Sequence, residues 1–169
     1  VQALINLGGK KGTEMKMAKA IHRVNENQKD VLADKILNYL DGDIKGKRIA
    51  VWGLSFKPGT DDMRNAPSIN LIKSLLDHGA KVVAHDPVAI NTAKRELPEE
   101  VIFNDDQYQT LNNAEALAVV TEWKKFRNPN FEKMMEFMDQ PAIFDGRNIY
   151  SPEKLSDLGF HYEGIGRSI

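Results

Sequence analysis

From residue 44 onward, short apolar runs alternate with longer amphipathic stretches, and this alternation limits the chain to one class of fold. Apolar runs of about four or five residues are typical of strands buried on both faces of a parallel sheet, and amphipathic stretches between them are typical of crossover helices. The pattern predicts an α/β fold with a doubly wound parallel sheet of about six strands. The predicted strands are residues 48–52, 81–84, 101–103, 116–120, 142–144 and 160–164.

A long helical arm is expected to precede this Rossmann-like sheet. Residues 14–40 contain neither proline nor glycine, and apolar positions such as Met17, Ile21 and Val24 recur at helical spacing. A single helix over residues 14–40 would extend roughly 40 Å, whereas the usual helix of a globular protein has only about 11 to 12 residues. We therefore expect this helix to span two bodies or to pack against a second copy. Residues 1–7 predict a shorter helix that ends at Gly8 and Gly9.

The loop after the first predicted strand is long and charged. It holds Lys57, Arg64 and the acidic pair Asp61 and Asp62. Ligands of open α/β sheets bind beyond the carboxyl ends of the strands, so this is a candidate ligand loop. The loop is not a dinucleotide-binding fingerprint, because Gly53 is not followed by the further glycines that a glycine-rich phosphate-binding turn needs. The alternative is a surface loop whose charges pair with one another.

Two further polar positions follow predicted strands at the same sheet edge. Asp86 ends the second strand, where a dinucleotide domain keeps the carboxylate for the ribose; the alternative is a helix N-cap. Arg147 follows the fifth strand next to Gly146, and its planar fork of donors suits phosphate oxygens. The alternative for Arg147 is an ion pair with Asp145 or Glu122.

Composition narrows the classes of function. With 23 basic and 24 acidic residues the formal net charge is −1, so no overall field attracts nucleic acid or an anionic membrane. No apolar run is long enough to cross a membrane and the first residues lack the order of a signal peptide, so we expect a cytoplasmic protein. The four histidines are not at metal-ligand spacing, and we predict no metal site. The segment from Gly164 to Arg167 is expected to be the end of the last strand.

Four motifs resemble those of one enzyme family in their order and spacing. They are the segment from Gly53 to Pro67, Asp86-Pro87, Thr121-Glu122-Trp123 and the segment from Phe144 to Asn148. The chain resembles the UDP-glucose/GDP-mannose dehydrogenases over essentially its whole length, and the last two motifs are most similar to the UDP-glucose 6-dehydrogenase branch. Residues 24–29 resemble the family's central helix, which links two nucleotide-type domains and forms the dimer contact. The resemblance therefore implies a linker and dimerisation segment at residues 1–43 and a UDP-binding domain at residues 44–169.

The resemblance also implies an enzymatic activity, and it implies that this chain lacks some of the residues that the activity needs. Members of this family oxidise the C6 alcohol of a nucleotide sugar to a carboxylate, in two hydride transfers to NAD, through covalent intermediates on a cysteine. This chain has no cysteine and no dinucleotide fingerprint. We therefore expect this chain to be the C-terminal part of such an enzyme and to be inactive alone. NAD would be bound mainly by an N-terminal domain. The alternatives are a free-standing UDP-sugar binding or dimerisation module and a sister enzyme with another sugar nucleotide.

Site residues follow from the resemblance position by position. Phe56 and Lys57 resemble the family's substrate contacts at the UDP end, and Arg147 resembles the arginine that helps to hold UDP. Arg64 resembles the arginine that reaches the NAD cofactor. The implied partners are a UDP-sugar, the N-terminal NAD-binding domain and a second copy of the chain, which is bound through residues 14–40.

Overall fold

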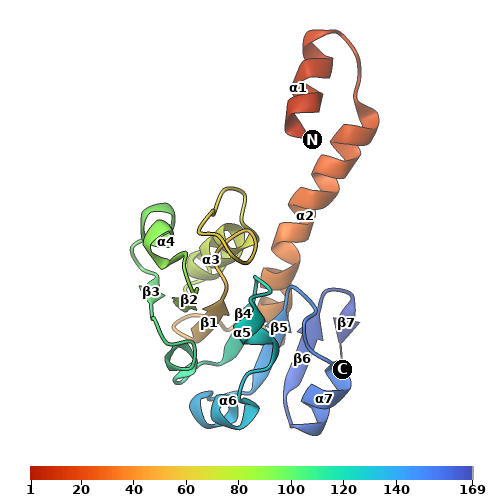
Figure 1. The fold of residues 1–169 in the computed structure, drawn as a ribbon. Coiled ribbons are helices and arrows are strands. Elements are labelled where there is room, and N and C mark those ends of the chain that lie inside the picture. The colour runs from red at the N-terminus through yellow and green to blue at the C-terminus, as the bar shows by residue number, and fades with distance from the viewer. Residues whose placement is uncertain (169) are drawn as a thin grey trace.

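Seven strands form one sheet at the centre of the computed structural model, which describes residues 1–168 (Figure 1). Their spatial order is β3-β2-β1-β4-β5-β6-β7, and all neighbours among the first six are parallel. The strands are β1 (Arg48–Trp52), β2 (Lys81–His85), β3 (Ile102–Phe103), β4 (Ala116–Val119), β5 (Ala142–Asp145), β6 (His161–Gly164) and β7 (Arg167–Ser168). The predicted doubly wound sheet is confirmed, and the strand order reverses direction between β1 and β4.

The end of the chain differs from the prediction. The segment from Gly164 to Arg167 does not simply end the last strand, because the chain reverses at Ile165 and Gly166 and returns as β7, antiparallel to β6. Gly166 adopts a φ of +67°, a conformation that glycine takes without steric cost. A two-residue strand is too short to show a periodic pattern, so pairing with β6 defines it. Ile169 lies outside the described residues.

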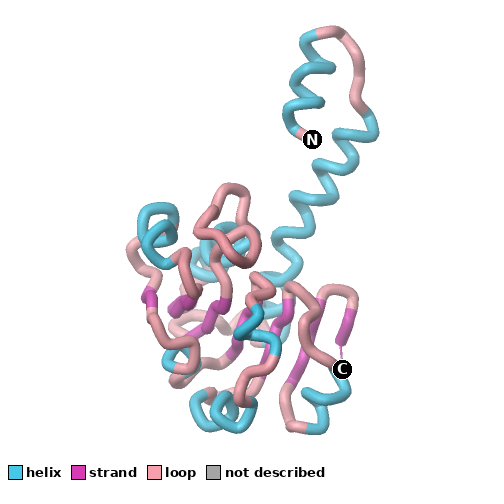
Figure 2. The backbone as a smooth tube through the Cα atoms, in the orientation of Figure 1, coloured by secondary structure: helices cyan, strands magenta, loops and turns pink. Residues whose placement is uncertain are grey.

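Helices cover both faces of the sheet (Figure 2). Their bounds are α1 (Gln2–Lys10), α2 (Lys16–Tyr39), α3 (Pro67–Asp77), α4 (Ile90–Glu96), the 3-10 helix η1 (Gln109–Leu111), α5 (Lys124–Arg127), α6 (Phe131–Phe137) and α7 (Pro152–Asp157). Alternate residues of β1 face opposite ways: Ile49 and Val51 pack with α2, α3 and α4, whereas Ala50 and Trp52 pack with η1, α5, α6 and α7. Burial on both faces explains why these strands are continuous apolar runs in the sequence.

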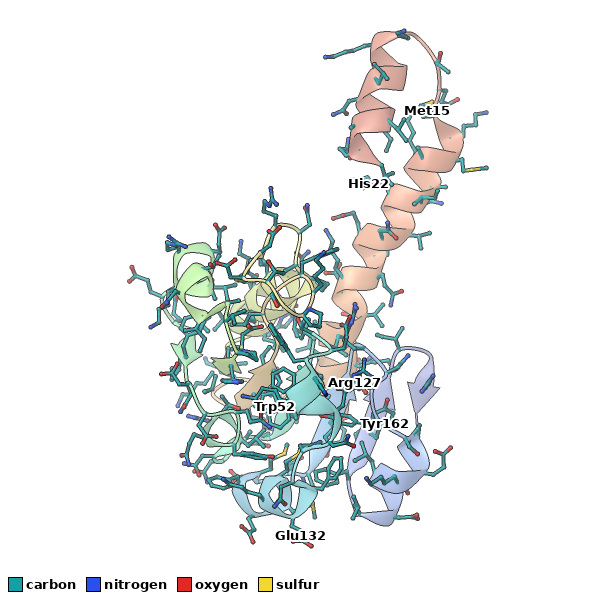
Figure 3. All side chains as sticks on the ribbon, in the orientation of Figure 1. Met15, His22, Trp52, Arg127, Glu132 and Tyr162 are labelled. Carbon is teal, nitrogen blue, oxygen red and sulfur yellow. The ribbon has the colours of Figure 1, made fainter. Side chains whose placement is uncertain are left out.

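The predicted helical arm is present and projects from the body of the molecule (Figure 1). At about 1.5 Å per residue, the 24 residues of α2 extend about 36 Å. Its buried residues are Leu32, Ala33 and Ile36, all in the C-terminal half. The apolar positions in the first half are exposed, Met17 by 78% and Val24 by 62%. Met15 and His22 lie along this projecting part (Figure 3).

The predicted end of the first helix is wrong. Helix α1 continues through Gly8 and Gly9 to Lys10, and the left-handed residue that follows it is Gly12, with a φ of +64°. Gly8 is buried where α1 folds back on α2, and a Cβ atom there would overlap the side chain of Met15. The glycine at position 8 thus permits close packing of the two helices and does not end the first one.

Candidate functional site

A cavity of about 660 Å³ lies between the arm and the carboxyl ends of the central strands. Polar side chains of α2 form one wall, and the loops that follow β1 and β5 form the other. The lining includes His22, Asn25, Glu26, Lys29 and Leu32 of the arm and Phe56, Asn65, Val120, Gly146, Arg147 and Ile165 of the body. In a sheet of this strand order, ligands bind beyond the carboxyl ends of the strands at the point of reversal, and the cavity lies there.

The structure brings two of the four predicted site residues together. Phe56 and Arg147 both line the cavity, although their loops follow strands that are far apart in the sequence. Phe56 is 53% exposed, so its ring is accessible to a ligand or a partner. Lys57 is exposed and lies beside Phe56 without lining the cavity, and no ion pair among residues 1–168 includes it.

Arg147 is held by an ion pair inside the site. Its Nε contacts a carboxylate oxygen of Glu122, in the loop after β4, and its backbone N–H donates to Asp145 Oδ1 at 3.0 Å. Burial of Glu122 disfavours its charge, but the bond from Arg147, a backbone hydrogen bond and the charges of Arg147 and Arg127 together outweigh burial, so the pKa of Glu122 lies below its ordinary value. Of the two ion-pair alternatives for Arg147, the structure contains the pair with Glu122, whereas Asp145 accepts only from the backbone of Arg147.

Arg64 lies outside the cavity and is paired within its own loop. Its Nε and Nη2 donate to the two carboxylate oxygens of Asp62 at 3.0 and 2.7 Å. The hydrogen bonds from Arg64 lower the pKa of Asp62 to about 2. The side chain of Arg64 is 88% exposed, so the guanidinium can be reached from solvent or by another domain. For Arg64, the expectation of charges that pair within a surface loop is confirmed.

Asp86 is a buried acceptor of backbone hydrogen bonds. Oδ1 accepts from the N–H groups of Val88 and Ala89 at 2.9 Å, in the turn that leads into α4. Oδ2 accepts from Leu54 and Ser55 of the loop after β1. Both alternatives for Asp86 are wrong: the N-cap of α4 is Ala89, and the oxygens of Asp86 are engaged by backbone N–H groups of the protein and are not directed at a ribose.

The loop after β5 is fixed by two side chains. Asp145 is fully buried and accepts from the backbone of Arg147, Ile149 and Tyr150; burial raises the pKa of this carboxyl despite these bonds. Asn148 pairs with both backbone groups of Ile165 at 3.0 Å, so it ties the loop to the β6–β7 hairpin. Ile165 and Arg147 are thereby held on the same side of the cavity.

Gly146 brings the arm close to the sheet. A Cβ atom at this position would lie 3.0 Å from the carbonyl oxygen of Val119 and 3.1 Å from Cδ2 of Leu32. Gly146 therefore lines the cavity and also makes room for α2.

The wall formed by α2 was not predicted as part of the site. Positions 22, 25, 26 and 29 all carry polar side chains that line the cavity, and their spacing of three and four places them on one helix face. This spacing in the sequence could have indicated a polar face of α2. It could not indicate that this face lines the cavity, because that depends on the angle between the arm and the sheet.

The described residues offer neither a metal cluster nor a membrane span. No three acidic or histidine side chains of residues 1–168 are grouped so that they could hold a metal ion. Within the same part of the chain, no helix combines the length and apolar character needed to cross a membrane.

Comparison with known proteins places these features in one family. Residues 50–152 match the UDP-binding domain of the UDP-glucose/GDP-mannose dehydrogenase family. The chain is 42% identical to the UDP-glucose 6-dehydrogenase of Pseudomonas aeruginosa over 172 aligned positions, which cover 99% of this chain and 38% of that enzyme. It is 38% identical to the enzyme of the same name from Rhizobium meliloti, again with 98% of this chain and 38% of that enzyme covered.

A solved structure agrees with these matches. The UDP-glucose dehydrogenase of Pyrobaculum islandicum superposes with a TM-score of 0.78 and 31% sequence identity, over 87% of this chain and 32% of that one. This chain therefore spans less than two fifths of the length of the relatives that it matches.

Proposed function

This chain belongs to the UDP-glucose/GDP-mannose dehydrogenase family, and from that membership we propose that it is the UDP-binding part of an NAD-dependent UDP-glucose 6-dehydrogenase. The complete enzyme oxidises UDP-glucose to UDP-glucuronate in two hydride transfers to NAD. The main support is the cavity at the point of strand reversal, where Phe56 and Arg147 meet. In this proposal residues 44–169 form the UDP-binding domain and residues 1–43 form the linker and dimerisation segment.

Arg147 and Lys57 are proposed to hold the pyrophosphate of UDP. The pyrophosphate carries about two negative charges, and charge-assisted hydrogen bonds from two cations at one sheet edge complement them. The Glu122 contact uses Nε of Arg147, one nitrogen of a planar group with five N–H donors. Phe56 contributes its exposed ring and its backbone. Binding energy from the nucleotide then positions the distant sugar for the reaction.

NAD does not fit a full site on the described residues. Both carboxylate oxygens of Asp86 accept backbone hydrogen bonds, and Gly53 is followed by Leu54 and Ser55, so neither a ribose acceptor nor a glycine turn is available. We propose that NAD is bound mainly by an N-terminal domain of the complete enzyme and that Arg64 contacts it. For this contact, a phosphate must replace the Asp62 carboxylate or share Arg64 with it. A cytoplasmic location stays a prediction from the sequence.

Calorimetric titration of the complete enzyme with UDP tests the proposed site. We expect Lys57→Ala and Arg147→Ala each to weaken binding by about 1.5 to 3 kcal/mol, the range for hydrogen bonds to charged groups. Lys81→Ala is the matched control, because it removes the same kind of charge at the start of β2, the opposite edge of the sheet. Unchanged affinity in both site variants would contradict the assignment. A parallel titration with GDP distinguishes this enzyme from one that uses a guanine nucleotide.

A further inference from the structure

One buried carboxylate joins the loops that surround the proposed UDP site. Asp86 is 1% exposed, and its Oδ2 accepts from the backbone N–H groups of Leu54 at 2.8 Å and Ser55 at 3.2 Å. The same oxygen accepts from Nε1 of Trp123 at 3.1 Å. The loops after β1, β2 and β4 therefore meet at a single side chain.

A second contact reinforces this junction. The hydroxyl group of Thr121, in the loop after β4, donates to the carbonyl oxygen of Ser55 at 2.6 Å. Leu54 and Ser55 lie beyond the end of β1, after Gly53, where the ladder bonds of the sheet have ended, so their buried N–H groups need another acceptor. Asp86 supplies it. Phe56 and Lys57 are the next two residues of the chain.

We propose that Asp86 is a positioning residue for the UDP site. It holds the segment from Leu54 to Lys57 against the loop that carries Glu122, and Glu122 in turn contacts Arg147. Asp86 touches no ligand itself and acts through Phe56 and Lys57. This inference rests on the function proposed above, because it assumes that those residues bind UDP.

The chemistry of the site explains why a carboxylate is required. Oδ1 faces the backbone N–H groups of Val88 and Ala89. Oδ2 faces the N–H groups of Leu54, Ser55 and Trp123 and the hydroxyl group of Ser55. A carboxylate can accept on both sides, whereas an asparagine amide must turn its NH2 group toward one set of donors. Charge-assisted bonds of this kind are also about twice as strong as neutral ones.

The first test measures UDP affinity and thermal stability of Asp86→Asn in the complete enzyme. We expect the dissociation constant for UDP to rise about tenfold or more in the folded protein, with the affinity for NAD changed by less than about threefold. Thr110→Val is the matched control, because it removes two other buried hydrogen bonds, from Trp52 Nε1 to Thr110 Oγ1 and from Thr110 Oγ1 to the carbonyl oxygen of Gln107. The control should lower the melting temperature and leave UDP affinity unchanged. Unchanged UDP affinity in folded Asp86→Asn overturns the inference.

Trp123→Phe provides the test if Asp86→Asn fails to fold. It keeps an aromatic ring and removes the N–H donor to Asp86. We expect a smaller rise of the UDP dissociation constant, about threefold. If the value for Trp123→Phe equals that of the parent enzyme, the proposed link between these loops is wrong.

A double-mutant cycle separates positioning from simple destabilisation. If Asp86 acts through Lys57, then Lys57→Ala will weaken UDP binding less in the Asp86→Asn background than in the parent enzyme. Combined with Thr110→Val, Lys57→Ala should keep its full effect. Additive effects in the first pair overturn the inference about Asp86. If neither Lys57→Ala nor Arg147→Ala changes UDP affinity in the parent enzyme, the proposed UDP site is wrong, and the inference about Asp86 fails with it; additive effects alone overturn only the inference about Asp86.

Discussion

At the scale of single residues, Gly53 is the position after β1 at which the chain leaves the sheet and enters the ligand loop. It adopts a φ of +93°, and a Cβ atom there would lie 2.5 Å from Cβ and 2.6 Å from the backbone nitrogen of Thr121. Thr121 in turn bonds the loop at Ser55. The loops after β1 and β4 can approach each other this closely only because position 53 has no side chain.

We predict that Gly53→Ala destabilises the fold by roughly 2 to 5 kcal/mol. About 1 to 2 kcal/mol comes from the unfavourable backbone conformation and about 1 to 3 kcal/mol from the clash with Thr121. Gly59→Ala is the control: its φ is +81°, but a Cβ atom meets no neighbour within 4 Å, so only the backbone cost of about 1 to 2 kcal/mol should appear. Urea unfolding measures both values; equal losses would show that the clash is relieved by other means.

The candidate site could be predicted residue by residue only in part. The sequence placed Lys57, Arg64 and Arg147 at one sheet edge, because the ends of parallel strands share an edge. The sequence did not decide the ion-pair partners of the arginines. Ion pairs depend on the paths of the loops, and loops have no periodic pattern in the sequence. Glu122 and Asp62 are those partners in the structure.

At the scale of secondary-structure elements, one ion pair links the arm to the sheet. Lys35 of α2 donates to Oε2 of Glu163 in β6 at 2.7 Å, and His161 contacts the other oxygen of Glu163 at 3.2 Å. Partial burial opposes the charge of Glu163, but the bonds from Lys35 and His161 outweigh it, and the pKa of Glu163 lies below its ordinary value of 4.5. Tyr39 also stacks on His161, with ring centroids 4.3 Å apart.

We predict a pH-dependent stabilisation from Glu163. Because its folded pKa lies below the ordinary value, the contribution is fully present above pH 4.5 and is lost as the pH falls through the folded pKa. Glu163→Gln should therefore cost roughly 0.2 to 1 kcal/mol near neutral pH, and the difference from the parent should shrink below pH 4.5. Unfolding curves at several pH values measure it. Glu136→Gln, which replaces a carboxylate at an exposed position of α6, serves as the control; a constant cost for Glu163→Gln at all pH values would contradict this account.

Elements were predictable where burial imposes a period on the sequence. The four central strands β1, β2, β4 and β5 are buried on both faces and were found as apolar runs. The strand β7 was missed because two residues show no pattern, and α1 was ended too early because Gly8 serves packing against Met15. In both cases a tertiary contact decided the local structure.

At the scale of the whole molecule, the exposed apolar positions of the arm bear on assembly. Met17, Ile21 and Val24 recur on one face of α2 and are exposed by 78%, 45% and 62%. Such a stripe on a projecting helix indicates a partner surface. The proposed occupant is a second copy of the chain, bound through residues 14–40.

We predict that Val24→Glu weakens this dimer. Burying a valine side chain contributes about 1.5 to 3 kcal/mol, and each 1.4 kcal/mol is about tenfold in affinity, so the dimer dissociation constant should rise about tenfold or more. Sedimentation equilibrium measures the change. Lys19→Glu introduces the same side chain on the opposite side of α2 and should leave the dimer intact. A dimer with unchanged affinity in Val24→Glu would place the interface elsewhere.

The C-terminal half of α2 is packed against the sheet and its N-terminal half projects from the body, so α2 is fixed at one end only. Its pivot is the contact of Leu32 with Gly146, and the cavity opens between the arm and the sheet edge. A small rotation at the pivot moves the free end at Met15 farther than it moves Leu32, in proportion to the length of the helix. His22 and Asn25 travel with it, so the width of the cavity follows the tilt of the arm. Any tilt of the arm about this contact would change the width of the cavity, so a ligand that fills the cavity and a partner that binds the arm would act on the same geometry.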